Sequence, residues 1–136
     1  MPTIEGVYTG GLRTRLRHVR SGNEIITDAP VDNQGKGEAF SPTDLLAASL
    51  GSCMLTLMGI AATKHDIDID GTTVKITKIM AESPRRVSEI IINMNLPHDK
   101  YSDEEKTILL EAARNCPVSK SLNAGIRQVL EVNYGG

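Results

Sequence analysis

An uncharged stretch of nineteen residues, from Leu45 to Thr63, constrains the fold more than any other feature of the chain. As a helix rising ~1.5 Å per residue, it is almost long enough to cross a bilayer. The stretch nevertheless contains small and polar residues, lacks an aromatic belt, and is flanked on both sides by strand patterns. We therefore expect a helix that is buried on all sides rather than a membrane span.

The residues before this stretch predict where the helix begins. Ser41 suits the N-cap, Pro42 suits the first helical position, and Asp44 falls in the first turn, where a carboxylate complements the helix dipole. Residues 29–41 are rich in turn formers and predict a loop that leads into the helix.

Strand patterns make up most of the remaining chain. Alternating apolar residues predict strands between Ile4 and Asp28, an antiparallel pair over 72–81 and 87–96, and a final strand over 126–134. Two shorter helices are expected before the final strand, one after a capping box at Ser102 and one opened by Pro117. This order predicts a single domain over residues 1–136 with an α+β fold, in which antiparallel sheets pack around a long buried central helix.

The predicted central helix also bears on assembly. A helix that is apolar all round must be covered by a sheet or by a second copy of the chain, and Gly51 and Gly59 would let two such helices approach closely. We therefore expect a homodimer. Ten helical residues separate Thr43 from Cys53 by ~15 Å, so the partner chain is expected to supply any polar group near the thiol.

Charge limits the expected class of binding partner, and the N-terminal sequence indicates the expected location. The formal net charge is -2, and no run of lysines and arginines suggests a nucleic acid or membrane surface as partner. The first residues lack the basic region and the apolar run of a signal peptide, so a cytoplasmic location is expected. Thiols are kept reduced there, which disfavours a permanent disulfide.

The chain has two cysteines, Cys53 within the uncharged stretch and Cys116 directly before Pro117. From position alone, we expect Cys53 to be buried and Cys116, at a helix start, to carry the more activated thiolate. Such a pair suits transient redox chemistry, in which one thiolate becomes a sulfenic acid and the other condenses with it to a disulfide. The attacking thiolate also needs a cation, for which Arg13 is a candidate.

Two other interpretations stay open at this point. A free cysteine in an apolar helix is often a packing residue, and a row of strand arginines is often a solvated face. A zinc site could combine the cysteines with His18, His65 or His98, but no pair of these residues has close ligand spacing. We therefore expect neither a metal nor a cofactor.

Two sequence motifs resemble those of a known family. SPTDLLAASLGSC over residues 41–53, followed by NCPV over 115–118, resembles the OsmC/Ohr family of osmotically inducible and organic hydroperoxide resistance proteins. The resemblance covers nearly the whole chain. It implies an intertwined α+β homodimer that reduces organic hydroperoxides with a cysteine pair and is regenerated by a dithiol such as a lipoylated protein.

The same resemblance implies roles for individual residues. Cys53 matches the peroxidatic cysteine, Cys116 the resolving cysteine, and Arg13 the arginine that activates the thiolate. Arg15 lies on the same strand face as Arg13 and is the alternative, because a two-residue shift leaves the face unchanged.

One departure from the family pattern lies at the helix start. The family's peroxidases carry a glutamate directly after the helix proline, where this chain has Thr43, and the nearest carboxylate, on Asp44, is rotated by about 100°. The chain thus resembles the divergent OsmC-like branch. We expect a thiol-dependent peroxidase, and the alternative is a non-catalytic redox sensor or small-ligand-binding protein of the same fold.

Overall fold

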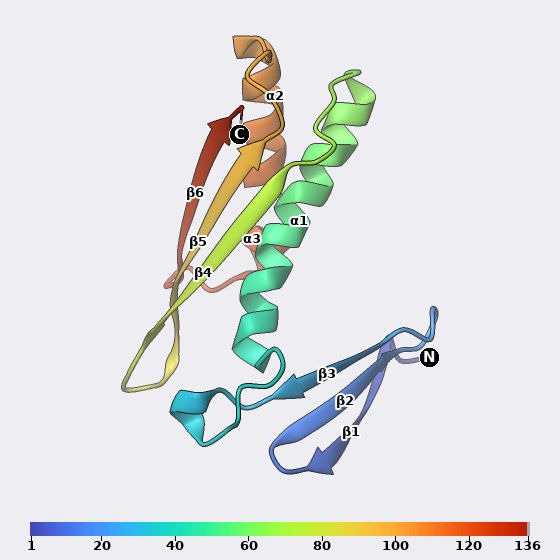
Figure 1. Cartoon of the computed structure of the whole chain (residues 1–136), viewed down its shortest axis with the longest axis vertical. Helices are drawn as coiled ribbons and strands as arrows, with labels where there is room; N and C mark the ends of the chain where they lie inside the picture. The colour runs from blue at the N-terminus through green and yellow to red at the C-terminus, as the bar shows by residue number, and fades with distance from the viewer. Residues whose placement is uncertain (136) are drawn as a thin grey trace. The chain divides into compact units, whose positions relative to one another are not determined.

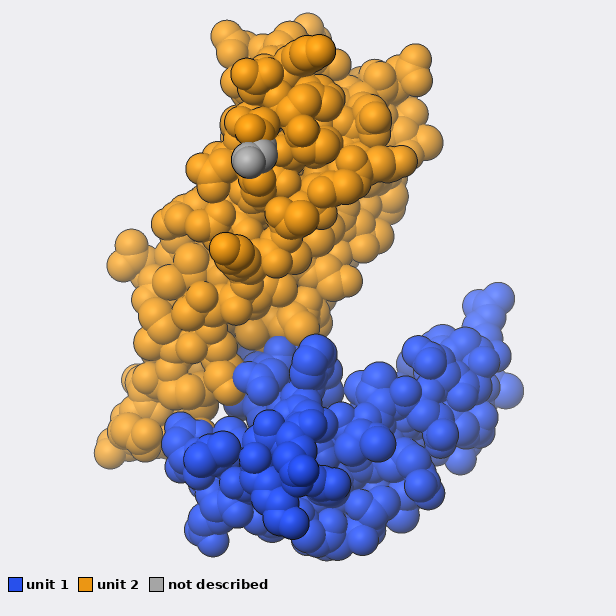
Figure 2. Space-filling view, in the orientation of Figure 1, with its two compact units in different colours: residues 1–46 blue, residues 47–136 orange. Residues whose placement is uncertain are grey.

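The structure is a computed structural model, and it describes residues 1–135. The chain forms two compact units, residues 1–46 and residues 47–136 (Figure 2). Long apolar strands and helices make up the second unit, whereas the first is built from short strands and a loop. That the chain is a single domain stays a prediction.

The first unit is a three-stranded antiparallel sheet. Its strands are β1 (Ile4–Gly10), β2 (Arg13–His18) and β3 (Glu24–Asp28), in the order β1-β2-β3. Gly10, Gly11 and Leu12 all have positive φ in the turn between β1 and β2, which favours the two glycines found there. A loop with a short 3-10 helix, η1 (Val31–Asn33), follows β3 and returns beside it, where Phe40 pairs with Thr27.

The central helix, α1 (Pro42–Lys64), begins where the sequence predicts. The Asp44 N–H donates to the Ser41 hydroxyl at 3.1 Å, and the Ser41 N–H donates to the Asp44 carboxylate at 3.0 Å. This reciprocal pair satisfies two backbone donors that the first helical turn would otherwise leave unpaired. The predicted N-cap at Ser41 is confirmed.

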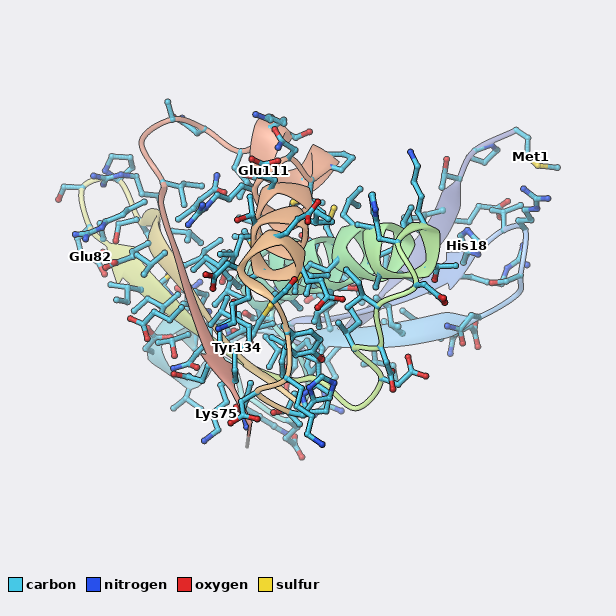
Figure 3. The ribbon with its side chains drawn as sticks, turned by 90° about the horizontal axis from the view of Figure 1, so that it is seen from above. Met1, His18, Lys75, Glu82, Glu111 and Tyr134 are labelled. Carbon is cyan, nitrogen blue, oxygen red and sulfur yellow. The ribbon has the colours of Figure 1, made fainter. Side chains whose placement is uncertain are left out.

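The second unit consists of a sheet and the helices beside it. Its elements after α1 are β4 (Thr73–Ala81), β5 (Arg86–Leu96), α2 (Asp103–Arg114), α3 (Pro117–Ser121) and β6 (Arg127–Tyr134). In Figure 1, α1 and α2 lie on the same side of the β4-β5-β6 sheet. The view from above in Figure 3 shows the same arrangement, with Glu111 on α2 and Tyr134 near the end of β6. The mixed α+β fold agrees with the prediction.

One strand runs against the antiparallel expectation. β4 and β5 pair antiparallel as predicted, but β6 runs parallel to β5, from Glu89 beside Arg127 to Leu96 beside Tyr134. A parallel neighbour needs a crossover connection, which α2 and α3 supply. The apolar alternation within one strand does not predict whether its neighbour runs parallel or antiparallel to it.

Within one chain α1 is buried on one face only, and its predicted burial on all sides, which needs a second copy of the chain, stays a prediction. Its buried residues follow the helical repeat of three or four positions, with one adjacent pair: Ala47, Leu50, Gly51, Met54, Met58 and Ala62. Ile60, on another face, is 60% exposed. By length and composition α1 could cross a membrane, but core helices pass the same test, and the Leu50 and Met58 side chains are fully buried.

Gly51 lets α1 lie close to the sheet. A Cβ atom at this position would lie 2.5 Å from Cδ1 of Ile76 on β4 and 3.4 Å from Cδ1 of Ile92 on β5. The close approach predicted at this glycine is therefore made to the chain's own sheet. Among residues 1–135, no atom beyond its chain neighbours and its own helix backbone lies within 4 Å of a Cβ built at Gly59, so the helix surface is open there.

We expect Gly51→Ala to destabilise the protein. Alanine gains ~1 kcal/mol of helix propensity, but overlap with Ile76 costs ~1–3 kcal/mol, so the expected net loss is about 1 kcal/mol. Urea unfolding at one protein concentration measures it. Ser52→Ala, at the next and exposed position, is the matched control and should stay within ~0.5 kcal/mol of wild type. A Gly51→Ala variant as stable as wild type would contradict this packing.

Candidate active site

The structure brings the two cysteines together in the second unit. Cys53 lies on α1 and is partly exposed, whereas Cys116 lies directly before α3 and is fully buried. The Cys53 and Cys116 thiols are neighbours, close enough for Cys53 to raise the pKa of Cys116. Two thiols in contact, only one of them open to solvent, can react in sequence with an external oxidant and then with each other.

Cys116 is the N-cap of α3, and Pro117 takes the first helical position, as the sequence predicts. The Ser119 backbone N–H donates to Cys116 Sγ at 3.4 Å. Burial nevertheless raises the pKa of the Cys116 thiol. The Ser119 N–H acts in the opposite direction, and the neighbouring Cys53 thiol adds to the rise.

The expectations for the burial and activation of the two thiols were therefore wrong. Cys116 was expected to carry the more activated thiolate, and Cys53 to be buried. α3 has only five residues, so the backbone N–H groups of Ser119 and Val118, rather than a long helix dipole, oppose the desolvation of Cys116. Cys53 is the more accessible sulfur because α1 is buried on one face only.

Arg13, in the first unit, is held by two carboxylates. Its NH2 nitrogen pairs with Oδ2 of Asp28 on β3 at 3.5 Å and with Oε1 of Glu38 in the following loop. Arg13 and Asp28 are direct neighbours in the register of β2 and β3. Within residues 1–135, both ion pairs of Arg13 use its NH2 nitrogen. A guanidinium also has N–H donors on its NH1 and Nε nitrogens.

Asp28 is an unusual partner because its side chain is buried. It is 1% exposed, and its Oδ2 also accepts the Glu38 backbone N–H at 3.0 Å. That N–H, together with Arg13, holds the pKa of Asp28 below its ordinary value, although burial acts in the opposite direction. Among residues 1–135, Oδ1 of Asp28 is buried without a hydrogen-bond partner.

Arg15 and Asp44, the other charged candidates, have different surroundings. Arg15 is exposed and pairs with exposed Glu24 at 3.9 Å, a contact of the kind that contributes little. The Asp44 carboxylate accepts the Ser41 N–H in the helix cap. Within residues 1–135, no three His, Cys, Asp or Glu side chains are placed to hold a metal ion.

Sequence reasoning missed Asp28 and Glu38 as partners of Arg13. The register of the predicted hairpin could have pointed to Asp28, because pairing β2 with β3 about their turn places Arg13 opposite it. No comparable signal was available for Glu38, which approaches through the return of an irregular loop.

Comparison with known proteins decides the family. The family model for OsmC-like proteins matches residues 35–131, a segment that contains both cysteines and Glu38. The chain belongs to the OsmC/Ohr family. A protein of Methanocaldococcus jannaschii of uncharacterized function is 31% identical over 103 residues, which are 69% of this chain and 52% of the relative. The chain thus spans about half of that relative's length.

Solved structures agree with this assignment. A protein of Psychrobacter arcticus 273-4, provisionally assigned to osmotic stress and detoxification, is 54% identical, with a TM-score of 0.92 and coverage of 97% of this chain and 96% of that one. An organic hydroperoxide resistance protein of Elizabethkingia anophelis shares the fold at 21% identity, with a TM-score of 0.75 and coverage of 98% and 97%. Membership of the OsmC/Ohr family supports a general role in redox stress.

The buried Asp28 gives this OsmC-like protein a testable pH dependence. Because its native pKa is lowered, the Asp28 carboxylate stabilises the fold above its ordinary pKa of 3.8, and this contribution is lost as the pH falls through the lower native value. Asp28→Asn should therefore be less stable than wild type at neutral pH, and the gap should narrow at acid pH.

Urea unfolding of both proteins between neutral pH and about pH 3 measures this gap. Glu38→Gln is the matched control, since it removes the other, exposed carboxylate on the same guanidinium and should change stability far less. A gap between Asp28→Asn and wild type that is constant with pH would show that the charge of Asp28 does not stabilise the fold.

Proposed function

We propose that this protein is a thiol-dependent peroxidase that reduces organic hydroperoxides, with Cys53 attacking and Cys116 resolving. The difference in burial between the two touching thiols carries the proposal. A peroxide can reach the partly exposed Cys53, whereas Cys116 is fully buried and its raised pKa keeps it protonated until it is needed.

The reaction balances with these two sulfurs. The Cys53 thiolate attacks the terminal peroxide oxygen, the O–O bond breaks, and the alkoxide takes up a proton and leaves as an alcohol. Cys116 then attacks the sulfenic sulfur of Cys53, forming the disulfide and releasing water. A dithiol, such as a lipoyl group carried by a protein, returns the two electrons by thiol–disulfide exchange.

Arg13 is proposed as the cation that favours the Cys53 thiolate and stabilises the departing alkoxide. Its two carboxylate partners both engage NH2, which leaves the donors of NH1 and Nε for another anion. Arg13 is preferred to Arg15 because a buried carboxylate holds it, whereas Arg15 has an exposed partner. Asp44 is retained as a candidate at the helix start.

Assembly as a homodimer is part of the proposal. The three-stranded sheet of the first unit exposes large apolar side chains, including Ile4, Tyr8 and Ile26. α1 exposes Ile60 beside the open surface at Gly59. Exposed apolar surface of this kind on two units favours burial against a second copy. The cytoplasmic location and the dithiol partner remain parts of the same proposal.

The first test is turnover of cumene hydroperoxide with dithiothreitol or a lipoyl donor. Wild type should turn over, and Cys53→Ser should be inactive because no sulfenic acid forms. Cys116→Ser should consume about one equivalent of peroxide per chain and then stop, because the sulfenic acid cannot be resolved. Mass spectrometry of peroxide-treated wild type should find the Cys53–Cys116 disulfide. Oxidation without turnover would favour the redox-sensor alternative.

The second test addresses the dimer. Light scattering at micromolar concentration should give about twice 14.7 kDa for wild type. Ile60→Glu places a charge on the exposed face of α1 and should shift the protein towards monomer. Thr107→Glu, at an exposed position of α2, is the matched control and should leave the mass unchanged. A stable, active wild-type monomer would refute this assembly.

Mixing subunits tests whether one site draws on both chains. Cys53→Ser and Arg13→Ala proteins should each be inactive alone. If Arg13 acts across the dimer, the mixed dimer regains one intact site, because the Cys53→Ser chain lends its Arg13 to the Cys53 of the other chain. No recovery of activity after verified exchange would place Arg13 and Cys53 of one site on the same chain.

A further inference from the structure

A reciprocal pair of hydrogen bonds fastens α3 to β6. The Ser119 hydroxyl donates to Oε1 of Gln128, and Nε2 of Gln128 donates to the Ser119 carbonyl oxygen at 3.1 Å. Both side chains are half-buried. One glutamine amide thus holds the hydroxyl and the main chain of Ser119 at once, which restricts both the position and the rotation of this residue.

Ser119 is also the residue that contacts the buried sulfur. Its backbone N–H donates to Cys116 Sγ at 3.4 Å, and Cys116 in turn neighbours the Cys53 thiol. A continuous chain of contacts therefore leads from Gln128 through Ser119 and Cys116 to Cys53. Every member of this chain lies in the second unit.

We propose that Gln128 is a positioning residue for the resolving step, holding Ser119 so that Cys116 Sγ stays aimed at the sulfenic acid of Cys53. The inference rests on the proposed peroxidase function. In this step the Cys116 sulfur forms the S–S bond, the S–O bond of the sulfenic acid breaks, and the hydroxide leaves as water with the thiol proton. Gln128 is hydrogen-bonded to Ser119 rather than to either sulfur.

Position matters in this step because two reactions compete for the sulfenic acid. Cys116 converts it to the disulfide, whereas a second peroxide molecule oxidises it to sulfinic acid, which the dithiol cannot reduce. The ratio of sulfinic acid to disulfide therefore reports the rate of resolution at a given peroxide concentration. A displacement of ~1 Å in a reacting group can cost ~10²-fold in rate, so even a partial loosening of α3 should be visible in this ratio.

The decisive variant is Gln128→Met, which keeps the side chain's length and removes both hydrogen bonds to Ser119. Wild type and variant receive identical peroxide pulses, and mass spectrometry measures the two oxidised forms of Cys53. We expect the ratio of sulfinic acid to disulfide to rise about tenfold. The rate of the first peroxide reaction should stay the same, because that reaction does not involve Cys116.

Two serine variants complete the test. Ser119→Ala removes one of the two hydrogen bonds and should raise the ratio less, which gives a second reading should Gln128→Met fold poorly. Ser121→Ala removes a neighbouring hydroxyl of α3, which donates to the Pro117 carbonyl at 2.8 Å, and should keep the wild-type ratio. Thermal unfolding of each variant separates positioning from general loss of stability.

Four outcomes are decisive. An unchanged ratio in Gln128→Met and Ser119→Ala would overturn the role of Gln128, as would an equal rise in Ser121→Ala. Slowing of the first peroxide reaction by the same factor as resolution would also overturn it, because that result indicates general distortion. Absence of any disulfide in wild type would instead refute the proposed function itself, and the wild-type arm reveals this before any variant is compared.

Discussion

The packing of α1 against the β4-β5-β6 sheet is the contact on which the proposed thiol chemistry depends. Gly51 has no side chain to separate the helix from Ile76 and Ile92, and Cys53 follows two residues later. The same core buries Cys116 completely beside Cys53. A close helix-to-sheet contact thus accounts for one sulfur that is open to solvent, on Cys53, and one buried sulfur beside it, on Cys116. The proposed sequential oxidation requires this difference in access.

Each unit buries an ionisable group, Asp28 in the first and Cys116 in the second, and desolvation decides the direction of the pKa shift only at Cys116. In the second unit, burial raises the pKa of the Cys116 thiol despite the N–H of Ser119. In the first, the Glu38 N–H and Arg13 overcome burial at Asp28 and keep its carboxylate ionised. Burying an ionised carboxylate costs free energy unless it is hydrogen-bonded and paired. Asp28 therefore restricts the orientation of Arg13 more than the exposed Glu24 restricts that of Arg15.

Local sequence signals predicted most of the elements because each has a cause that acts over a few residues. The Ser41 cap and the capping box at Ser102 satisfy backbone groups next to them in the chain, whereas the proline of α3 lacks an N–H that the first turn would leave unpaired. All three are present. The direction of β6 and the partners of Arg13 depend on residues far apart in sequence. Periodicity carries no information about such contacts. The expected antiparallel direction of β6 was accordingly wrong, and Asp28 and Glu38 were missed as partners of Arg13.

The sequence by itself determined the family, the α+β class, the extent of the helix and the two sulfurs, because motifs and periodicity are properties of neighbouring residues. Which sulfur is buried was decided only by the tertiary structure. Solvent access at Cys53 depends on which face of α1 meets the sheet, and burial at Cys116 depends on packing contributed by several elements. The thiol pKa follows desolvation by that packing, a quantity that does not exist until the chain has folded.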